Sequence, residues 1–450
     1  MRELDSKRTI WDTQHLTDLT ALGDSFKCDQ WTRHRVSLKD TLMRIAVISP
    51  FVDKQHGTER CLAELMERLV SNYPCEIHLY AQRVDDVAVE CMIEGSNPRG
   101  PGIRWHKVPS IPGPHLVQYL WWFAANTLLR WWHRRSGKVF SDVLFSPGVN
   151  AWNPDVVHVH IVFEEFYQRV RNELRFRSTP VLSWPVLLHR RLYYGLARWL
   201  EVRIYPKKRV RLAAVSRMVQ DQLATYFHRS DAKCVRNGVN LSQFAPAIRL
   251  ERRSQARDRL AIPAQTFVFL LIGNDWRTKG LHLAIEAFGI CNELPIHLLV
   301  VGRDQTRPFL QRIHQLNITD RITFLPPARD TMHFYAAADA YVGPSLEDAF
   351  GLPVLEAMAC GLPVITSMNA GVSELIEDRS NGLLLHDPGN VVELVTLIRT
   401  LVSDSALREV LASNALKTAE RCTWDESAAA LWHLLNEVLA GKRSGSDKHH

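Results

Sequence analysis

The stretch AYVGPSLEDAFGLPVLEAMACGLPVIT, residues 340–366, combines a strand, a loop, a helix and a second strand. The apolar runs AYVGPS and LPVIT predict buried strands. Between them, Pro353 suits the first turn of a helix and Gly361 suits its end. A strand that leads through a helix to another strand is the repeating unit of a parallel sheet covered by helices. The stretch therefore predicts an α/β domain.

The same alternation extends in both directions, and a chain of 450 residues is long enough for two domains. Residues 43–235 predict an N-terminal Rossmann-like unit, and residues 236–423 predict a second one. A last amphipathic helix over 424–440 is expected to cross back to the first unit. Residues 1–42 are expected to be a poorly ordered extension, and 441–450 a disordered tail. The predicted fold class is α/β, with two Rossmann-like, doubly wound domains facing each other across a cleft.

The formal net charge of +7 is unevenly distributed along the chain. Residues 111–210 hold fifteen Lys and Arg against six Asp and Glu, a local excess of +9. A cationic surface of this kind favours phosphate-bearing partners or an anionic membrane.

Cysteine usage and hydropathy indicate the compartment. The eight cysteines are scattered and form no CxxC pair, which disfavours disulfides and a zinc site. There is no uninterrupted apolar run of about eighteen residues, and the N-terminus MRELDSKRTIWDTQH is polar. The sequence therefore predicts neither a spanning helix nor a signal peptide, and we expect a cytoplasmic protein.

The loop before Pro353 has the features of a binding site. It delivers Phe350, Gly351 and Leu352 at a helix N-terminus, where free N–H groups attract anions. Glu356 follows one turn into the helix and can accept hydrogen bonds from a diol, while Asp348 on the loop can bind a second hydroxylated group. Taken singly, each acid could be an ordinary loop or surface residue. Together they suit a molecule that carries phosphates between two sugars.

A second loop, in IGNDWRTKGLHLAIEAF, carries two cations. A predicted strand ends at Gly273, Arg277 and Lys279 follow, and a helix begins near Gly280. Two cations beside a helix start suit a diphosphate and could stabilise it as a leaving group. The alternative is a pair of solvated loop cations.

These two stretches resemble the signature of family 4 glycosyltransferases, which are retaining enzymes of the GT-B fold. In that signature two acids separated by seven residues bracket a Phe-Gly pair, as Asp348 and Glu356 do here. The usual first Glu is thus an Asp, or is displaced to Glu347. The resemblance implies that the first acid contacts hydroxyl groups of the donor sugar and the second the ribose. GNDWRTKG is similar to bacterial lipopolysaccharide-core glucosyltransferases, although many family members have Arg where this chain has Asn274.

Further features of the same family occur in less regular form before residue 235, and one more, Glu374, follows it. Gly57 matches one of two family glycines that let the backbone approach donor and acceptor, and His56 replaces the other. In DVVHVH the resemblance implies that His160 faces the donor sugar; the alternative is a core histidine. Arg217 matches another landmark, and Glu374 is expected at the far side of the donor pocket.

A basic and aromatic region is a candidate contact with membranes. Residues 115–135 predict an amphipathic helix, and residues 169–209 add Arg, Tyr and Trp. The expected inward stripe of the helix consists of Val117, Trp121, Ala124, Leu128 and Trp131. Cations interleaved with aromatic residues fit an anionic membrane interface. The alternatives are a core helix with a solvated basic face and a single-stranded nucleic-acid surface. No RNA-binding or helix-turn-helix signature is present, so we expect no nucleic-acid partner.

The residues and the resemblance together predict a retaining glycosyltransferase. It would move a hexose from a UDP- or GDP-linked sugar to a glycan or lipid-linked acceptor in polysaccharide or lipopolysaccharide synthesis, at the inner face of the cell membrane. No cofactor or metal is expected. The expected catalytic residues are His160, Arg277, Lys279 and Asp348, and the expected donor-binding residues are Gly57, Arg217, Gly273, Phe350, Gly351, Leu352 and Glu356. The alternatives are a sugar-nucleotide epimerase or phosphorylase on the same architecture, and a catalytically silent scaffold that binds the donor.

Overall fold

The computed structural model describes residues 42–55, 57–91, 102–170 and 184–446. The predicted N-terminal extension and His56 lie outside these residues, apart from Leu42. Leu42 and the residues after it form one compact unit.

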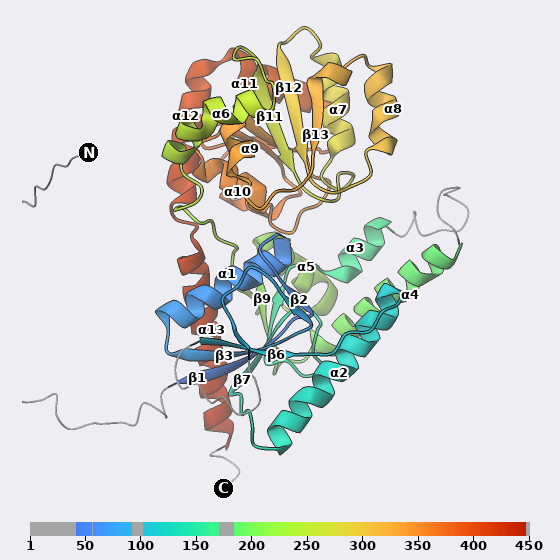
Figure 1. Ribbon diagram of the computed structural model, residues 1–450, viewed down its shortest axis with the longest axis vertical. Coiled ribbons are helices and arrows are strands. Elements are labelled where there is room, and N and C mark those ends of the chain that lie inside the picture. The colour runs from blue at the N-terminus through green and yellow to red at the C-terminus, as the bar shows by residue number, and fades with distance from the viewer. Residues whose placement is uncertain (1–41, 56, 92–101, 171–183, 447–450) are drawn as a thin grey trace, which may run out of the picture. The chain divides into compact units, whose positions relative to one another are not determined.

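Two parallel sheets organise this unit (Figure 1). In the described residues the first has eight strands in the order β10-β9-β8-β7-β1-β3-β6-β5. Its strands are β1 (Met43–Ile48), β3 (Cys75–Ala81), β5 (Glu90–Cys91), β6 (Gly102–Lys107), β7 (Val143–Pro147), β8 (Val156–Val159), β9 (Arg211–Ala214) and β10 (Lys233–Cys234). A short parallel pair, β2 (Phe51–Val52) and β4 (Arg83–Val84), lies outside this sheet.

The second sheet has, within the described chain, six strands in the order β13-β12-β11-β14-β15-β16. These are β11 (Phe267–Ile272), β12 (Ile296–Val301), β13 (Ile322–Leu325), β14 (Ala340–Gly343), β15 (Val364–Ser367) and β16 (Leu383–Leu385). The order reverses between β11 and β14, which is the switch point where ligands bind in doubly wound sheets. The predicted α/β class with two Rossmann-like sheets is confirmed.

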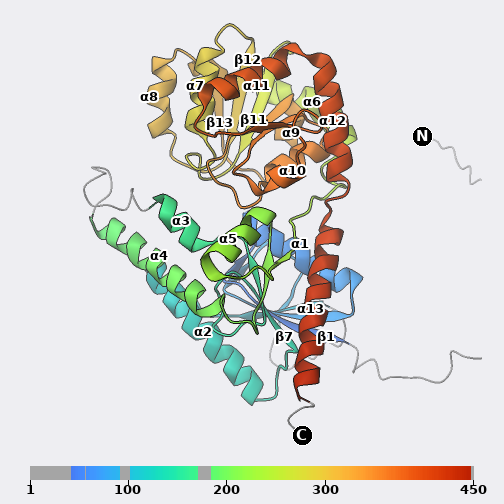
Figure 2. The same cartoon turned by 180° about the vertical axis from the view of Figure 1, so that it is seen from behind.

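Helices cover both faces of each sheet (Figures 1 and 2). They are α1 (Gly57–Asn72), α2 (His115–Arg135), α3 (Phe163–Val170), α4 (Trp184–Ile204), α5 (Arg217–Phe227), α6 (Pro246–Arg259), α7 (Leu281–Ile290), α8 (Arg307–Gln315), α9 (Met332–Ala337), α10 (Leu352–Ala359), α11 (Val391–Ser403), α12 (Ser405–Ala419) and α13 (Trp424–Ser446), with 3-10 turns at Thr319–Arg321 and Gly371–Leu375. On the second sheet α7 and α11 pack against one face, and α9 and α10 pack against the other.

The last helix, α13, packs on the first sheet beside α1, where Trp424 and Leu431 enter the same core as Ile45. It continues to Ser446, so the prediction that a disordered tail begins at residue 441 is wrong for its described part. The reason is an anchor that the sequence does not reveal. Lys442 Nζ lies 2.6 Å from Asp155 Oδ2 and donates to the backbone carbonyl of Asp142, just before β7, at 2.8 Å.

Helix α2 buries the opposite line of side chains from the one predicted. All five members of the expected inward stripe are exposed, namely Val117, Trp121, Ala124, Leu128 and Trp131. Trp122 and Asn126 are buried instead, because Trp122 fills the space beside Ile48. Asn126 tolerates burial since its amide donates to the carbonyl of Trp122 at 2.7 Å within the same helix.

The C-terminal end of α2 closes over a buried cluster of histidines on the first sheet. His78 Nδ1 lies 2.9 Å from His106 Nε2, and the Tyr80 hydroxyl lies 3.0 Å from His133 Nδ1. Burial, together with the neighbouring imidazoles and Arg104, lowers the pKa of His106 to about 3. His106 is therefore neutral in the folded protein at ordinary pH.

This burial predicts a specific loss of stability in acid. In the unfolded chain the His106 pKa returns to about 6.5, so the unfolded state binds the extra proton between about pH 6.5 and 3. The stabilisation is complete above the unfolded pKa and is lost as the pH falls. Replacing His106 with Phe keeps a ring against Tyr80 and removes the titration. The deficit in unfolding free energy of His106→Phe relative to wild type should shrink by about 2 kcal/mol between pH 7 and pH 5.

Urea unfolding at the two pH values measures this difference. His433→Gln on the exposed face of α13 is the matched control and should show the same deficit at both. A His106→Phe deficit that does not change with pH would contradict a neutral buried imidazole.

Candidate functional site

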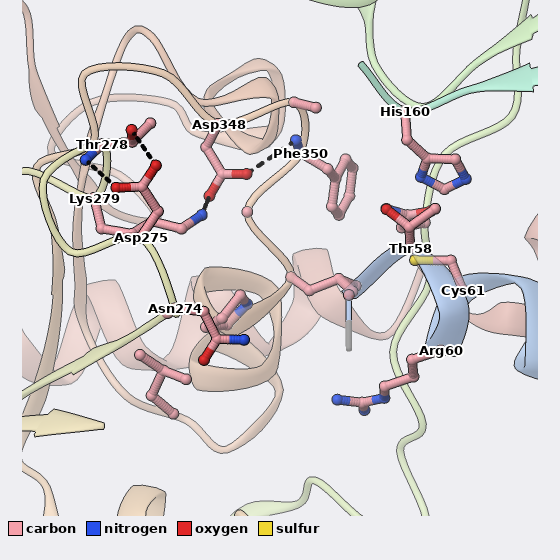
Figure 3. A pocket seen from close by; sticks show the side chains of 18 of the residues that line it. Thr58, Arg60, Cys61, His160, Asn274, Asp275, Thr278, Lys279, Asp348 and Phe350 are labelled. Carbon is pink, nitrogen blue, oxygen red and sulfur yellow. Dashed lines mark hydrogen bonds and ion pairs between the residues drawn. The ribbon is translucent and has the colours of Figure 1, made fainter. Parts of the chain in front are cut away.

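A cavity of about 420 Å³ lies at the carboxyl ends of the strands (Figure 3). Its lining includes the loops after β8, β11, β12 and β14, the first turns of α1 and α10, and residues of α5. The loops after β11 and β14 flank the switch point of the second sheet. The lining includes most of the residues singled out in the sequence, namely Gly57, His160, Gly273, Lys279, Asp348, Phe350, Gly351, Leu352 and Glu356.

The start of α10 presents backbone donors to this cavity. Gly351 caps the helix with φ 97°, a left-handed conformation that favours glycine. In the part of the chain that the structure describes, the N–H groups of Gly351 and Leu352 make no hydrogen bond. Free amides at a helix N-terminus form an anion site.

Two of the predicted catalytic residues lie together beside this helix start. Lys279 Nζ donates to Asp348 Oδ2, and Figure 3 shows the amine meeting the carboxylate. The backbone of Asp348 is held in turn, since its N–H donates to Asn369 at 3.0 Å and its carbonyl accepts from Gly371 at 2.8 Å. The carboxylate is therefore fixed at the cavity wall with a cation against it.

Glu356 is buried rather than exposed on its helix, with 3% of its surface accessible. The Tyr335 hydroxyl donates to Oε2 at 2.6 Å. Arg60 Nη1 lies 2.6 Å from Oε1, as an ion pair whose angles do not make a hydrogen bond. Burial raises the pKa of the Tyr335 phenol, so it stays a donor. Because a lone buried carboxylate is costly, these two partners explain how Glu356 remains in the wall.

His160 lines the cavity as a neutral imidazole. Burial and the adjacent His158 hold its pKa well below the usual range. The two rings meet edge to face with centroids 4.4 Å apart. His158 contacts the Val235 carbonyl through Nε2 at 3.1 Å, whereas Nε2 of His160 has no partner among the described residues. His158 is thus the core histidine of the pair, and His160 has a ring nitrogen available for a ligand.

Two predicted site residues lie away from the cavity lining. Arg277 is exposed and is not part of the cavity lining. It lies in a turn that is closed by a hydrogen bond of 2.9 Å from the Lys279 N–H to the Asp275 carbonyl, and this turn directs position 277 outward. Arg217 is also exposed, and its backbone N–H donates to Glu374 Oε2 at 2.6 Å. Glu374 thereby caps α5 and is not part of the lining.

Sequence reasoning missed Arg60 and Tyr335. Arg60 stands one turn after Gly57 on α1, so its place on the same helix face as Gly57 was a usable signal. Tyr335 lies in the short apolar helix α9, which gave no sign of a polar contact with Glu356.

Two features are absent from residues 42–55, 57–91, 102–170 and 184–446. None of the helices there is both long and apolar enough to cross a membrane. No three His, Cys, Asp or Glu side chains in that part of the chain are grouped so as to hold a metal ion.

Residues 252–418 match the family described as glycosyl transferases group 1. The matched segment holds all six described strands of the second sheet. It contains Lys279, Asp348 and Glu356, whereas Arg60 and His160 lie before it. The predicted resemblance is confirmed at this level.

Curated relatives with similar sequences are glycosyltransferases by name. The D-inositol 3-phosphate glycosyltransferase of Salinispora arenicola is 33% identical over 224 residues, which are 46% of this chain and 49% of that protein. The lipopolysaccharide glucosyltransferase WaaG of Escherichia coli K12 is 31% identical over 167 residues, 36% of this chain and 45% of WaaG. The chain therefore spans about half the length of these curated relatives.

Solved structures share the architecture over most of the chain. A crystal structure of WaaG, a glycosyltransferase involved in lipopolysaccharide biosynthesis, matches with a TM-score of 0.67 and 20% identity, over 86% of this chain and 98% of that one. Alr3699/HepE of Anabaena, crystallised with UDP and glucose, matches with a TM-score of 0.62 and 19% identity, over 88% and 100%. The predicted GT-B fold is confirmed.

Proposed function

We propose that the protein is a retaining glycosyltransferase that moves a hexose from a nucleoside diphosphate sugar to a glycan or lipid-linked acceptor. One observation carries this proposal: free amides of α10, the Lys279 ammonium and the buried Glu356 carboxylate converge on one cavity. An anion site and a diol site side by side match the chemistry of a nucleoside diphosphate. The family of residues 252–418 supports the same reaction class.

In this proposal the diphosphate lies against the amides of Gly351 and Leu352, with Lys279 beside it. The ribose hydroxyl groups bind Glu356, one turn further along α10. The hexose lies toward Asp348 and His160, where a carboxylate and a neutral imidazole can hydrogen-bond its hydroxyl groups.

The proposed chemistry follows from this placement. An acceptor hydroxyl attacks the anomeric carbon while the bond to the diphosphate oxygen breaks, and the diphosphate takes the electron pair. Lys279 and the helix amides stabilise the charge that develops on the leaving group. Retention with a single displacement requires attack on the face that the diphosphate leaves, and the departing oxygen then lies next to the hydroxyl proton and accepts it.

UDP-glucose is our first candidate for the donor. The support is the name of WaaG, a lipopolysaccharide glucosyltransferase, and the UDP and glucose in the HepE complex. The name of WaaG also favours an acceptor from lipopolysaccharide. A panel of UDP-, GDP- and ADP-sugars in a thermal-shift assay identifies the donor, since binding to the native state raises the melting temperature.

We further propose that α2 and α4 hold the protein on an anionic membrane, at the inner face where the donor is available. The two helices lie side by side (Figures 1 and 2). Their exposed apolar side chains form a surface that we call the aromatic–basic patch. Its members are Leu120, Trp121, Leu128, Trp131, Trp132, Leu188, Leu192, Trp199 and Val202.

Cations stand over the aromatic rings of this patch. Lys138 Nζ lies 4.3 Å from the centre of the Trp132 ring, and Arg203 Cζ lies 5.1 Å from that of Trp199. Exposed Trp and Leu combined with basic residues suit the boundary between lipid headgroups and acyl chains. The basic side chains complement the charge of anionic lipid headgroups, and we therefore propose an anionic membrane and not a protein partner.

Replacing Lys279 with Met should lower kcat about a hundredfold, because a preorganised donor to the leaving group is lost, a cost of about 3 kcal/mol. Arg277→Met is the matched control, two positions away and outside the cavity lining, and should stay within about twofold of wild type. Slow hydrolysis of the selected donor measures both without knowledge of the acceptor. Equal losses in the two variants, or none in Lys279→Met, would contradict the leaving-group role.

The membrane proposal has its own test. Wild-type protein should bind vesicles that contain anionic lipid, and the binding should weaken as salt rises. Leu128→Ser with Trp131→Ser should weaken it about tenfold through lost apolar burial. Val392→Ser, an exposed apolar position on α11, is the control and should have no effect. Equal binding to neutral and anionic vesicles argues against the patch.

A further inference from the structure

Each of two acids in the cavity is paired with a cation that lines the same cavity. Lys279 donates to Asp348, and Arg60 of α1 lies 2.6 Å from Glu356 of α10. Among the described lining residues, Arg60 and Lys279 are the two Lys or Arg side chains. Both cations are thus held by the carboxylates that the proposed function assigns to hydroxyl groups of the donor.

The charge balance of the lining makes Arg60 important. The described lining has four carboxylates, on Asp275, Glu347, Asp348 and Glu356, against those two cations. A diphosphate adds negative charge to a lining that already has an excess of it. Like charges repel more strongly in a partly buried site than in water. With Arg277 directed outward, Lys279 would be the single side-chain cation opposite the diphosphate unless Arg60 also faces it.

We propose that Arg60 is a second phosphate-binding cation of the donor site, reached by an exchange of partners. When the donor binds, its ribose hydroxyl groups take Glu356 and release Arg60 to the diphosphate. Lys279 makes the same exchange when the hexose takes Asp348. This inference rests on the proposed function, because it assigns a role within the same donor site.

The surroundings of Arg60 allow this exchange. Its side chain is 16% exposed, and its guanidinium carbon lies 5.6 Å from the centre of the buried Phe244 ring. The ring provides a contact for the guanidinium face that does not depend on the carboxylate. A planar guanidinium with five donors can bind phosphate oxygens in pairs. Although burial acts to lower it, the Glu356 charge keeps the pKa of Arg60 above its usual value, so the side chain stays a cation.

Glu356 also keeps a partner during the exchange. Its second oxygen accepts from the Tyr335 hydroxyl at 2.6 Å, and Tyr335 is fully buried and packs edge to face on Phe244. The carboxylate is therefore held in place from the α9 side when Arg60 turns away. Ribose hydroxyl groups then replace the ion pair with Arg60 by hydrogen bonds.

The test measures binding of three probes by calorimetry. The first is whichever of UDP, GDP and ADP binds the wild-type protein most tightly, the second is its parent nucleoside, and the third is inorganic pyrophosphate. Arg60→Met should weaken the binding of the nucleoside diphosphate and of pyrophosphate by about tenfold or more, because hydrogen bonds to a charged group are lost. It should leave nucleoside binding unchanged or tighter.

Glu356→Gln should act in the opposite direction. It frees Arg60 and should strengthen pyrophosphate binding, while nucleoside binding weakens through the loss of an ionised acceptor. Arg68→Met, on the same helix and outside the lining, pairs with Glu64 at 3.6 Å and is the control that should change none of the three. A merely structural role for Arg60 would instead lower binding of all probes together.

The inference is overturned if Arg60→Met leaves diphosphate affinity intact, or lowers nucleoside and pyrophosphate affinity equally. If Arg60→Met does not fold, Glu356→Gln provides the test, because unchanged or weaker pyrophosphate binding by Glu356→Gln would also overturn the inference. Wild-type protein that binds none of the nucleotides refutes the proposed function itself. Nucleotide binding that is insensitive to Arg60 refutes the exchange alone.

Discussion

The site depends on how the chain turns from β14 into α10. Gly351 adopts φ 97° as the cap of α10, and at this helix start the N–H groups of Gly351 and Leu352 make no hydrogen bond among the described residues. The loop before it is fastened from two sides. The Ala349 carbonyl accepts from Ser216 Oγ at 2.7 Å, and a Cβ at Gly371 would collide with the same carbonyl. Since Ser216 caps α5 on the first sheet, one hydrogen bond links the anion site to the opposite wall of the cavity.

Charge arrangement is the second constraint on this site. A cavity built for a diphosphate needs cations, and a cavity built for sugar hydroxyl groups needs carboxylates. Here the two requirements are met by ion pairs, Lys279 with Asp348 and Arg60 with Glu356. Pairing keeps buried charges compensated, which a partly buried wall requires. It also means that a ligand carrying both phosphates and hydroxyl groups can satisfy all four side chains at once.

The fold could be predicted because each strand is a continuous apolar run, which two-sided burial demands, and because Pro353 and Gly361 bound a helix by local chemistry. Lys279, Asp348 and Gly351 could be placed for the same reason, as each lies between a predicted strand and the start of the next helix. What failed depends on tertiary contact. Helix α2 buries the line of side chains that contains Asn126, because the Asn126 amide donates a hydrogen bond within its own helix. The polarity of the side chains therefore predicted the wrong buried face. No local pattern distinguishes the outward Arg277 from the inward Lys279, or brings Arg60 to Glu356.

A crystal structure with an intact nucleoside diphosphate sugar tests the central claim most directly. The account predicts diphosphate oxygens within about 3 Å of the backbone nitrogens of Gly351 and Leu352, and ribose hydroxyl groups on Glu356. A diphosphate bound away from the start of α10, or a ribose held by other residues, would contradict it.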